Sequence, residues 1–302
     1  MSAKRLALLV PGGRGQLGRE LARSAVPLVH APGSGELDLR DAAEVGDAVG
    51  SFAETALDND LRPVVVNAAA YTAVDAAESD ADAARSINVD GAAALARACA
   101  ARRVPLVHMS TDYVFSGDAD VPYEPDDPAE PRTVYGRTKL DGERAVLSAG
   151  ARACVVRTAW VYGAGGQNFV RTMSRLERER DSLSVVDDQV GAPTWTGDLA
   201  AGVVQLAGSF AERRDPQRPV LHCTNAGRTS WFSFARAVFA ELGADPERVQ
   251  PCSTEEFPRP APRPAHSVLS GRAWAAAGLT PLRDWRSALT AAFETDGAAL
   301  RR

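Results

Sequence analysis

Cysteine is scarce in this 302-residue sequence, and the cysteines are not spaced like those of a disulfide framework or a metal site. The four cysteines, Cys99, Cys154, Cys223 and Cys252, include no C-x-x-C pair and show no metal-ligand spacing. The sequence therefore indicates neither a disulfide framework nor a zinc site. Plain packing thiols in a reducing cytosol fit this pattern.

An excess of positive charge and long apolar runs are also missing. The net charge of −5 argues against a general nucleic-acid or membrane surface, so an anionic ligand would need local arginines. After Lys4 and Arg5 only five apolar residues precede Pro11, too few for the apolar core of a signal peptide. No apolar run approaches the roughly 20 residues of a membrane-spanning helix. We expect a cytoplasmic protein that binds neither nucleic acid nor a membrane.

A glycine-rich turn follows the first predicted strand. Residues 6–10 are a short apolar strand, and the next residues read P-G-G-R-G-Q-L-G, with Gly12, Gly15 and Gly18 spaced G-x-x-G-x-x-G. Residues 20–25 are predicted to be helical. A strand, a glycine turn and a helix N-terminus together favour a bound pyrophosphate, because glycines let the backbone approach it closely. The triplet alone would fit an ordinary tight turn equally well.

The end of the second predicted strand, residues 27–31, carries no acidic residue before Glu36 and Asp38. In dinucleotide-binding folds an acid at this place binds the adenosine ribose diol. Its absence leaves room for a 2′-phosphate, for which Arg14 in the glycine loop is a candidate partner. The other interpretation of Arg14 is a solvated side chain. We predict NADPH as the preferred cofactor, with NADH as the alternative.

Strands and helices alternate along the first half of the chain, as in a doubly wound parallel sheet. Further strands are predicted at 64–67, 104–108 and 152–157, and helices at 42–57 and 81–102. We predict an α/β fold with a Rossmann-like sheet in an NAD(P)-binding domain, residues 1–162. Residues 163–302 are predicted to form mainly a smaller α/β substrate domain, with some segments returning to the Rossmann sheet.

Later elements are less regular. Helices are predicted at 169–180, from 197 onwards and at 284–300, and strands at 183–187 and 220–223. Prolines at every second position from Pro258 to Pro264 exclude a helix or a central strand, so residues 257–264 are expected to form a wrapping loop.

The stretch from Ser110 to Lys139 carries the chemistry. Tyr135 and Lys139 are four residues apart and share a face of a predicted helix, while Thr111 and Asp112 follow the strand at 104–108. A cation about 4 Å away favours the phenolate by roughly 4 kcal/mol at an effective dielectric of about 20. That effect predicts a Tyr135 pKa lowered from about 10 to about 7.

These motifs resemble the extended short-chain dehydrogenase/reductase superfamily and, more closely, the dTDP-4-dehydrorhamnose reductase family. The markers run nearly end to end and include V-N-A-A-A-Y-T-A-V-D-x-A-E, S-T-D-Y-V-F-x-G, V-Y-G-x-T-K-L-x-G-E, R-T-x-W-V-Y and D-Q-x-G-A-P-T. The resemblance implies NADPH-dependent reduction of the C4 ketone of dTDP-4-dehydro-L-rhamnose to dTDP-L-rhamnose. Tyr135 would give the proton to the forming alkoxide.

The resemblance also implies residue roles. It assigns Thr111, Tyr135 and Lys139 to catalysis, with Lys139 holding the nicotinamide ribose. Expected substrate contacts are Thr111, Asp112, Trp160 and Arg263. Together with the glycine-loop residues above, the expected cofactor contacts are Gly12, Arg14, Gly15, Gln16, Leu17, Gly18, Asp38, Leu39, Ala70, Tyr71, Thr72, Met109, Tyr135 and Lys139.

Two departures from the family pattern concern binding. His266 replaces the asparagine of an R-P-x-N-S-x-L pattern that starts at Arg263. The family is reported to use Mg²⁺ at a dimer contact, and Glu20 matches one acidic position whereas Gly197 stands where another would lie. Hydride transfer with a Tyr–Lys pair needs no metal, so we predict none. A homodimer is compatible with the resemblance.

Other interpretations stay open. Taken singly, Trp160 fits a core residue, Thr111 and Asp112 fit a helix cap, and Tyr135 with Lys139 fits a surface pair. The enzymatic alternatives are an epimerase or another nucleotide-sugar 4-ketoreductase. A non-catalytic alternative is a regulatory subunit like that of methionine adenosyltransferase, which keeps the fold and the cofactor pocket.

Overall fold

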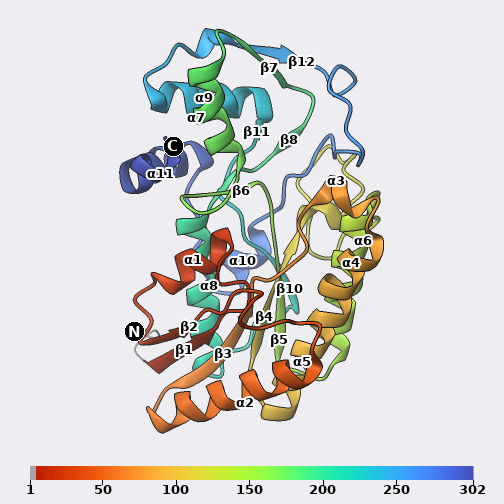
Figure 1. The fold of residues 1–302 in the computed structure, drawn as a ribbon, viewed down its shortest axis with the longest axis vertical. Helices are drawn as coiled ribbons and strands as arrows, with labels where there is room; N and C mark the ends of the chain where they lie inside the picture. The colour runs from red at the N-terminus through yellow and green to blue at the C-terminus, as the bar shows by residue number, and fades with distance from the viewer. Residues whose placement is uncertain (1–4, 302) are drawn as a thin grey trace.

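The computed structural model describes residues 5–301, and its centre is a parallel six-stranded sheet (Figure 1). The strand order is β10-β5-β4-β3-β1-β2, and every neighbouring pair is parallel. The predicted Rossmann-like α/β fold is therefore confirmed. The strands are β1 (Leu6–Leu9), β2 (Leu28–His30), β3 (Arg62–Asn67), β4 (Leu106–Thr111), β5 (Ala153–Thr158) and β10 (Val220–His222).

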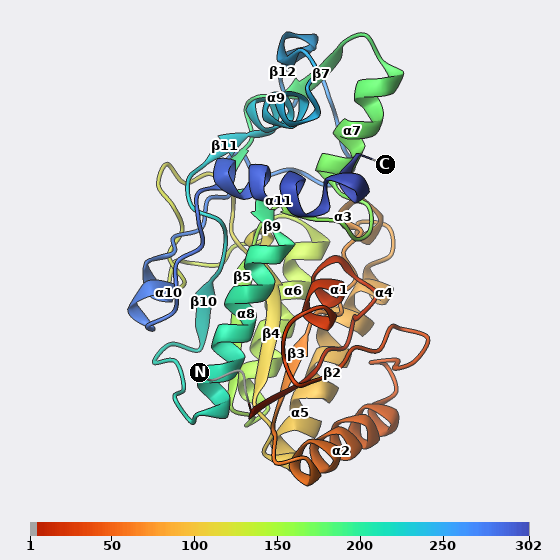
Figure 2. The ribbon, with the colours of Figure 1, turned by 90° about the vertical axis from the view of Figure 1, so that its left-hand side faces the viewer.

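Successive residues of the central strands pack into two different cores, because side chains alternate between the faces of a strand. Leu6 and Leu8 of β1 pack with one pair of helices, α1 (Gln16–Ala22) and α8 (Thr196–Ala211). Ala7 and Leu9 pack against α2 (Ala42–Asp58), α5 (Ala92–Arg102) and α6 (Val134–Ser148). Helices on both faces explain why these strands are apolar throughout (Figure 2).

The helix predicted for residues 81–102 is continuous but not uniform. It consists of α4 (Ala81–Arg85), a π-helical segment η2 (Ser86–Gly91) and α5. The helix predicted at 20–25 instead begins at Gln16, directly after the glycine turn. Short helical pieces connect other elements: α3 (Val74–Ala77), η3 (Asp112–Val114), η4 (Pro246–Arg248) and α10 (Arg272–Ala276).

The second half of the chain contributes to both halves of the molecule. Strand β10 pairs with β5, and α8 covers the sheet face that also carries α1. The remaining elements pack around a separate core, drawn in the upper half of Figure 1. They are α7 (Phe169–Glu179), α9 (Trp231–Leu242), α11 (Trp285–Leu300), β6 (Val161–Tyr162), β7 (Leu183–Val186), β8 (Val190–Gly191), β9 (Thr194–Trp195), β11 (Thr229–Ser230) and β12 (Val249–Cys252). The domain boundary at 162/163 stays a prediction.

Strand β1 lies between β2 and β3, so the strand order reverses beside it. Ligands of such sheets bind at the carboxyl ends of the strands next to this reversal. The loops after β1 and β3 touch there: Gly12 has φ +85°, and an added Cβ would lie 2.6 Å from the main-chain nitrogen of Ala69. Within residues 5–301, no helix combines the length and apolarity that crossing a membrane requires.

Candidate active site

A cleft of about 1220 Å³ opens at the carboxyl ends of the sheet strands, and residues of the second core form its other wall. Typical small-molecule sites are roughly 300–1,000 Å³, so this cleft is larger than the usual site of one small ligand. The predicted site residues that line it are Gly12, Arg14, Gly15, Gln16, Leu17, Asp38, Leu39, Ala70, Tyr71, Thr72, Met109, Thr111, Asp112, Tyr135, Lys139, Trp160 and Arg263.

Gly18 is the predicted cofactor residue that lies outside the lining. A Cβ at this position would collide with the carbonyl oxygen of Gly12 and with the Cα of Gly13. Its structural role is therefore the close approach of α1 to the glycine turn, as the third glycine of this spacing allows.

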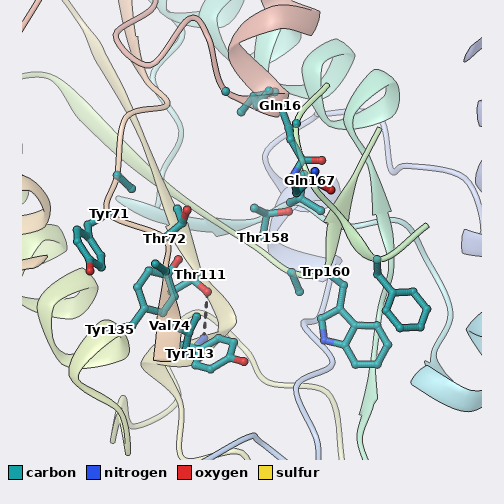
Figure 3. Close-up of a pocket in the computed structure, with 18 of the residues that line it drawn as sticks. Gln16, Tyr71, Thr72, Val74, Thr111, Tyr113, Tyr135, Thr158, Trp160 and Gln167 are labelled. Atoms are coloured by element: carbon teal, nitrogen blue, oxygen red, sulfur yellow. Dashed lines mark hydrogen bonds between the residues drawn. The ribbon is translucent and has the colours of Figure 1, made fainter. Parts of the chain in front are cut away.

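Helix α6 brings Tyr135 and Lys139 to the cleft. Its N-cap is Thr133, whose hydroxyl accepts a 3.0 Å hydrogen bond from the amide of Gly136. The missing side chain at Gly136 lets this first turn press against the carbonyl of Tyr113, where a Cβ would collide. Tyr135 thereby comes to lie beside Thr111 at the end of β4 (Figure 3).

The predicted pKa of about 7 for Tyr135 is wrong for this structure. Tyr135 is 8% exposed, and burial raises its pKa to about 12, against the opposing effect of the Thr111 hydroxyl. The Lys139 ammonium donates a 2.7 Å hydrogen bond to the carbonyl of Met109, so the main chain of β4 holds it. Burial also lowers the pKa of Lys139 to about 8, with Glu143 acting in the opposite direction.

Thr111 and Asp112 are linked to each other at the end of β4. The Thr111 hydroxyl donates to Asp112 Oδ1 at 2.9 Å and accepts from the amide of Tyr113 at 3.3 Å. The predicted capping role is thus present, because Thr111 is the N-cap of η3. Burial raises the pKa of Asp112 to about 6, against the opposing effects of the Ser267 and Thr111 hydroxyls.

Arg14 is not free in the structure. Its guanidinium lies 3.0 Å from Glu36 Oε1, and Glu36 Oε2 accepts a 2.7 Å bond from the amide of Gly33. The loop after β2 therefore brings Glu36 beside Arg14, although no acidic residue directly follows the strand in the sequence. Arg40 pairs with Asp38 and lowers the pKa of that carboxyl to about 2.

A buried ion pair stands behind the catalytic candidates. Glu143, one turn after Lys139 on α6, accepts from Arg157 Nε at 2.9 Å and from Arg157 Nη2 at 2.7 Å. It also accepts a 2.5 Å bond from the hydroxyl of Ser110, which precedes Thr111. The pair joins α6 to the ends of β4 and β5, and both side chains are almost completely buried.

Sequence reasoning missed Asn88, which holds the loop after β3 that carries three of the predicted cofactor contacts. Its side chain accepts from the amide of Tyr71 at 2.9 Å, and donates to the Tyr71 carbonyl at 3.2 Å and to the Thr138 hydroxyl at 3.0 Å. Asn88 lies in the π-helical segment, and such widened turns often occur at functional sites. No pattern in the sequence marks this turn.

Trp160 stands on the far side of the cleft from Tyr135 (Figure 3). Its backbone is left-handed, with φ +48°, which is rare for a bulky residue. Its ring stacks on that of Trp231, with centroids 3.5 Å apart and planes inclined by 5°. Gly191 lies against the ring, where a Cβ would collide. Trp231 also lines the cleft and was not predicted.

Arg263 lies at the cleft but is engaged by Asp75, with Nη2 and Oδ2 2.8 Å apart. His266, three residues further on, has no hydrogen-bond partner for either ring nitrogen within the described chain. Its main-chain amide donates to the carbonyl of Gly117 at 2.9 Å. The histidine therefore shapes the loop through its backbone.

The residues around Glu20 do not fit the Mg²⁺ ion that the family implies. Arg23 Nη1 lies 3.2 Å from Glu20 Oε1 and 3.4 Å from Asp296 Oδ1, so a guanidinium already bridges these carboxylates. A Cβ at Gly197 would lie 2.6 Å from the ring of Trp195, which leaves no room for an acid there. No group of three or more His, Cys, Asp or Glu side chains suited to a metal occurs between residues 5 and 301.

Known proteins resemble this chain along almost its full length. The sequence model described as "RmlD substrate binding domain" matches residues 6–297. The chain is 48% identical to a dTDP-4-dehydrorhamnose reductase of Mycolicibacterium smegmatis, covering 93% of this chain and 83% of that protein. It is also 48% identical to a probable dTDP-4,6-dihydroxy-2-methyloxan-3-one 4-ketoreductase of Streptomyces antibioticus, covering 94% of each.

Among solved structures, dTDP-4-dehydrorhamnose reductase from Bacillus anthracis in complex with NADP is 33% identical, with a TM-score of 0.88. The match covers 96% of this chain and 99% of that one. A dTDP-4-dehydrorhamnose reductase from Clostridium acetobutylicum is 37% identical, with a TM-score of 0.86 and the same coverage. The chain therefore belongs to the dTDP-4-dehydrorhamnose reductase family, NAD(P)H-dependent oxidoreductases of the extended short-chain dehydrogenase/reductase superfamily.

Proposed function

We propose that this enzyme reduces the C4 ketone of dTDP-4-dehydro-L-rhamnose to dTDP-L-rhamnose with NADPH, and that Tyr135 donates the proton. The observation that carries the proposal is the position of a buried, protonated phenol beside Thr111, in the same cleft as the glycine loop. A reductase needs its proton donor in the protonated form before each turnover. A pKa of about 12 keeps Tyr135 in that form at neutral pH.

The loop after β1 fits a dinucleotide. An added Cβ at Gly12 or Gly13 would collide with the neighbouring main chain, so only glycine fits at these two positions of the turn. Gly15 provides no side-chain acceptor at the start of α1, which leaves the amides of the first turn free for a phosphate. The NADP complex of the B. anthracis relative supports the same cofactor here.

When bound, NADPH supplies the hydride that adds to the carbonyl carbon. The Tyr135 hydroxyl gives its proton to the ketone oxygen as that oxygen becomes an alkoxide, so the product carries a hydroxyl at C4. The Thr111 hydroxyl turns from Asp112 to the same oxygen and fixes its position. Asp112, which lines the cleft beside Thr111, then accepts from a hydroxyl of the sugar.

Lys139 acts through the main chain in this proposal. Its bond to the Met109 carbonyl fixes the end of β4 next to Thr111, and its remaining N–H groups serve the nicotinamide ribose. The predicted direct effect on the Tyr135 pKa is not part of the mechanism.

The test is a coupled assay of NADPH oxidation over a panel of dTDP-4-keto-6-deoxy sugars. We expect the highest kcat/KM with dTDP-4-dehydro-L-rhamnose. A higher value with another 4-keto sugar would assign the enzyme to that substrate. The second candidate function is the one named for the S. antibioticus relative, because the identity to that ketoreductase is also 48%.

An epimerase keeps NAD bound and returns its hydride, whereas a reductase exchanges NADPH in every turnover. Stoichiometric NAD retained by the purified protein, seen by its ultraviolet absorbance, would favour the epimerase. If NADPH is oxidised with none of the sugars in the panel, the non-catalytic alternative, a regulatory subunit, is favoured. Homodimer formation and a cytoplasmic location stay predictions.

Cofactor preference depends on the pair between Arg14 and Glu36. We expect Arg14→Ala to lower the ratio of kcat/KM for NADPH to that for NADH, because the 2′-phosphate loses its cation. Glu36→Gln should raise this ratio, since it frees the guanidinium. An NADH preference in the native enzyme, or unchanged ratios in both variants, would contradict the role of Arg14.

A further inference from the structure

The cations that line the cleft differ in whether another group already neutralises them. Four Lys or Arg side chains occur in the lining, namely Arg14, Lys139, Arg259 and Arg263. A nucleoside diphosphate sugar, the substrate class of the proposed function, brings a doubly charged diphosphate into the cleft. Moving such a charge out of water is unfavourable unless a cation of the protein pairs with it.

Three of the four cations are engaged. Arg14 pairs with Glu36 at 3.0 Å near the glycine loop. Lys139 is 2% exposed, and its ammonium donates to the main chain of β4. Arg263 pairs with Asp75 at 2.8 Å.

The pair between Arg263 and Asp75 fixes the shape of residues 257–264, here called the proline strap. Arg263 Nη1 donates to the Ala261 carbonyl at 3.0 Å, and the Ala261 amide donates to Asp75 Oδ1 at 3.2 Å. Burial alone would raise the pKa of Asp75, but the bonds from Arg263 and Ala261 hold it below its usual value. The ion pair of Arg263 with Asp75 therefore attaches the proline strap to α3.

Arg259 is the exception. Its guanidinium lies 4.7 Å from the ring centroid of Phe257 and forms no direct ion pair with a carboxylate in the described part of the chain, although its charge also contributes to the lowered pKa of Asp75. Both side chains line the cleft, and the ring of Phe257 is half exposed. Pro258 and Pro260 flank the arginine and restrict its backbone, so the side chain is presented from a stiff segment.

We propose that Arg259 binds the diphosphate of the nucleotide sugar, and that Asp75 is a positioning residue that holds the strap through Arg263. The inference rests on the proposed function for its substrate class. It adds to the expected substrate contact Arg263 a phosphate contact at a residue outside the family pattern discussed above.

The kinetic test compares Arg259→Gln with Arg97→Gln, an exposed arginine of α5 outside the cleft lining that loses the same charge. We expect Arg259→Gln to raise KM for the dTDP-sugar about tenfold to hundredfold, as loss of a charged hydrogen bond predicts. The change in kcat and in KM for NADPH should be much smaller. Arg97→Gln should leave all three values unchanged. Equal KM values in both variants would overturn the proposal.

A binding test separates this inference from the proposed function. Titration calorimetry of the NADP-loaded enzyme with dTDP should show a loss of affinity of the same size in Arg259→Gln. Thymidine monophosphate should lose less. If no 4-keto sugar is reduced but dTDP binding still depends on Arg259, the inference stands and the proposed function fails. If Arg263→Gln loses dTDP affinity and Arg259→Gln does not, the inference is wrong.

Discussion

The phenol of Tyr135 lies against the first turn of its own helix and the end of β4, where water has little access. Burial sets its protonation state, because the ammonium of Lys139 is turned to the carbonyl of Met109. The i, i+4 spacing correctly predicts that Tyr135 and Lys139 reach one cleft. It cannot predict which acceptor a long ammonium side chain finds, and the electrostatic argument from spacing alone failed there.

Replacing Tyr135 by Phe removes the proton donor and keeps the ring. We expect kcat to fall by about two to four orders of magnitude, with a small change in the Kd of NADPH measured by fluorescence titration. Tyr113→Phe is the matched control, because its ring packs edge-on against Tyr135 at 5.5 Å. A kcat of Tyr135→Phe close to that of this control would refute the assigned role.

Asp112 makes stability depend on pH in a direction opposite to most carboxylates. Its pKa is raised from 3.8 to about 6 by burial, so the folded state binds the proton more tightly than the unfolded state. Below about pH 4 the carboxyl is protonated in both states, and it does not change the free energy of unfolding. Above about pH 6 the folded protein has to ionise it, which lowers the free energy of unfolding by about 3 kcal/mol.

Asp112→Asn should therefore gain stability relative to the native enzyme as the pH rises. We expect the difference in free energy of unfolding between the two proteins to shift by about 3 kcal/mol in favour of the variant between pH 4 and pH 7. Urea denaturation at several pH values measures this shift. A difference that stays constant with pH would show that Asp112 ionises without cost in the folded protein.

At the scale of elements, α6 is attached to the sheet by the buried pair of Glu143 and Arg157. Removing one partner of such a pair leaves a buried charge without compensation. Glu143→Leu should destabilise the fold by about 3–5 kcal/mol in urea denaturation. The double variant Glu143→Leu/Arg157→Met should regain much of this loss. If the double variant is as unstable as the sum of its two single variants, the pair is not coupled.

Periodicity and glycine spacing predict most of the elements that carry the site. The strand–turn–helix at the glycine loop, the helix of Tyr135 and the wrapping strap all follow from local residue types. The π-helical turn at Asn88 does not, and it lies where η2 packs closely on α6: a Cβ at Gly142 would collide with the Asn88 carbonyl. Pairings set by packing between distant segments leave no local signal.

At the scale of the whole molecule, the two halves of the chain are interleaved. Helix α8 provides Leu199, Val203 and Leu206 to the core on one face of the Rossmann sheet, although it follows residue 163. Its partner α1 alone is too short to cover that face. A division of the chain at 162/163 therefore does not separate two independent cores.

Residues 1–162 expressed alone should fail to fold as a monomer, because the face normally covered by α8 is exposed. We expect aggregates in size-exclusion chromatography and no cooperative thermal transition. Co-expression with residues 163–302 is the control, and it should restore a complex that binds NADPH. A monomeric, cooperatively folded 1–162 fragment would contradict the interleaving.

The parallel stack of Trp160 on Trp231 gives the enzyme an intrinsic optical reporter. The two indole rings are nearly parallel with centroids 3.5 Å apart, close enough for their electronic transitions to couple, so we expect the pair to contribute to the circular dichroism spectrum. Both rings line the cleft, so we expect a ligand that contacts Trp160 to change this contribution. Such a change would report occupancy of the cleft without a label and without turnover.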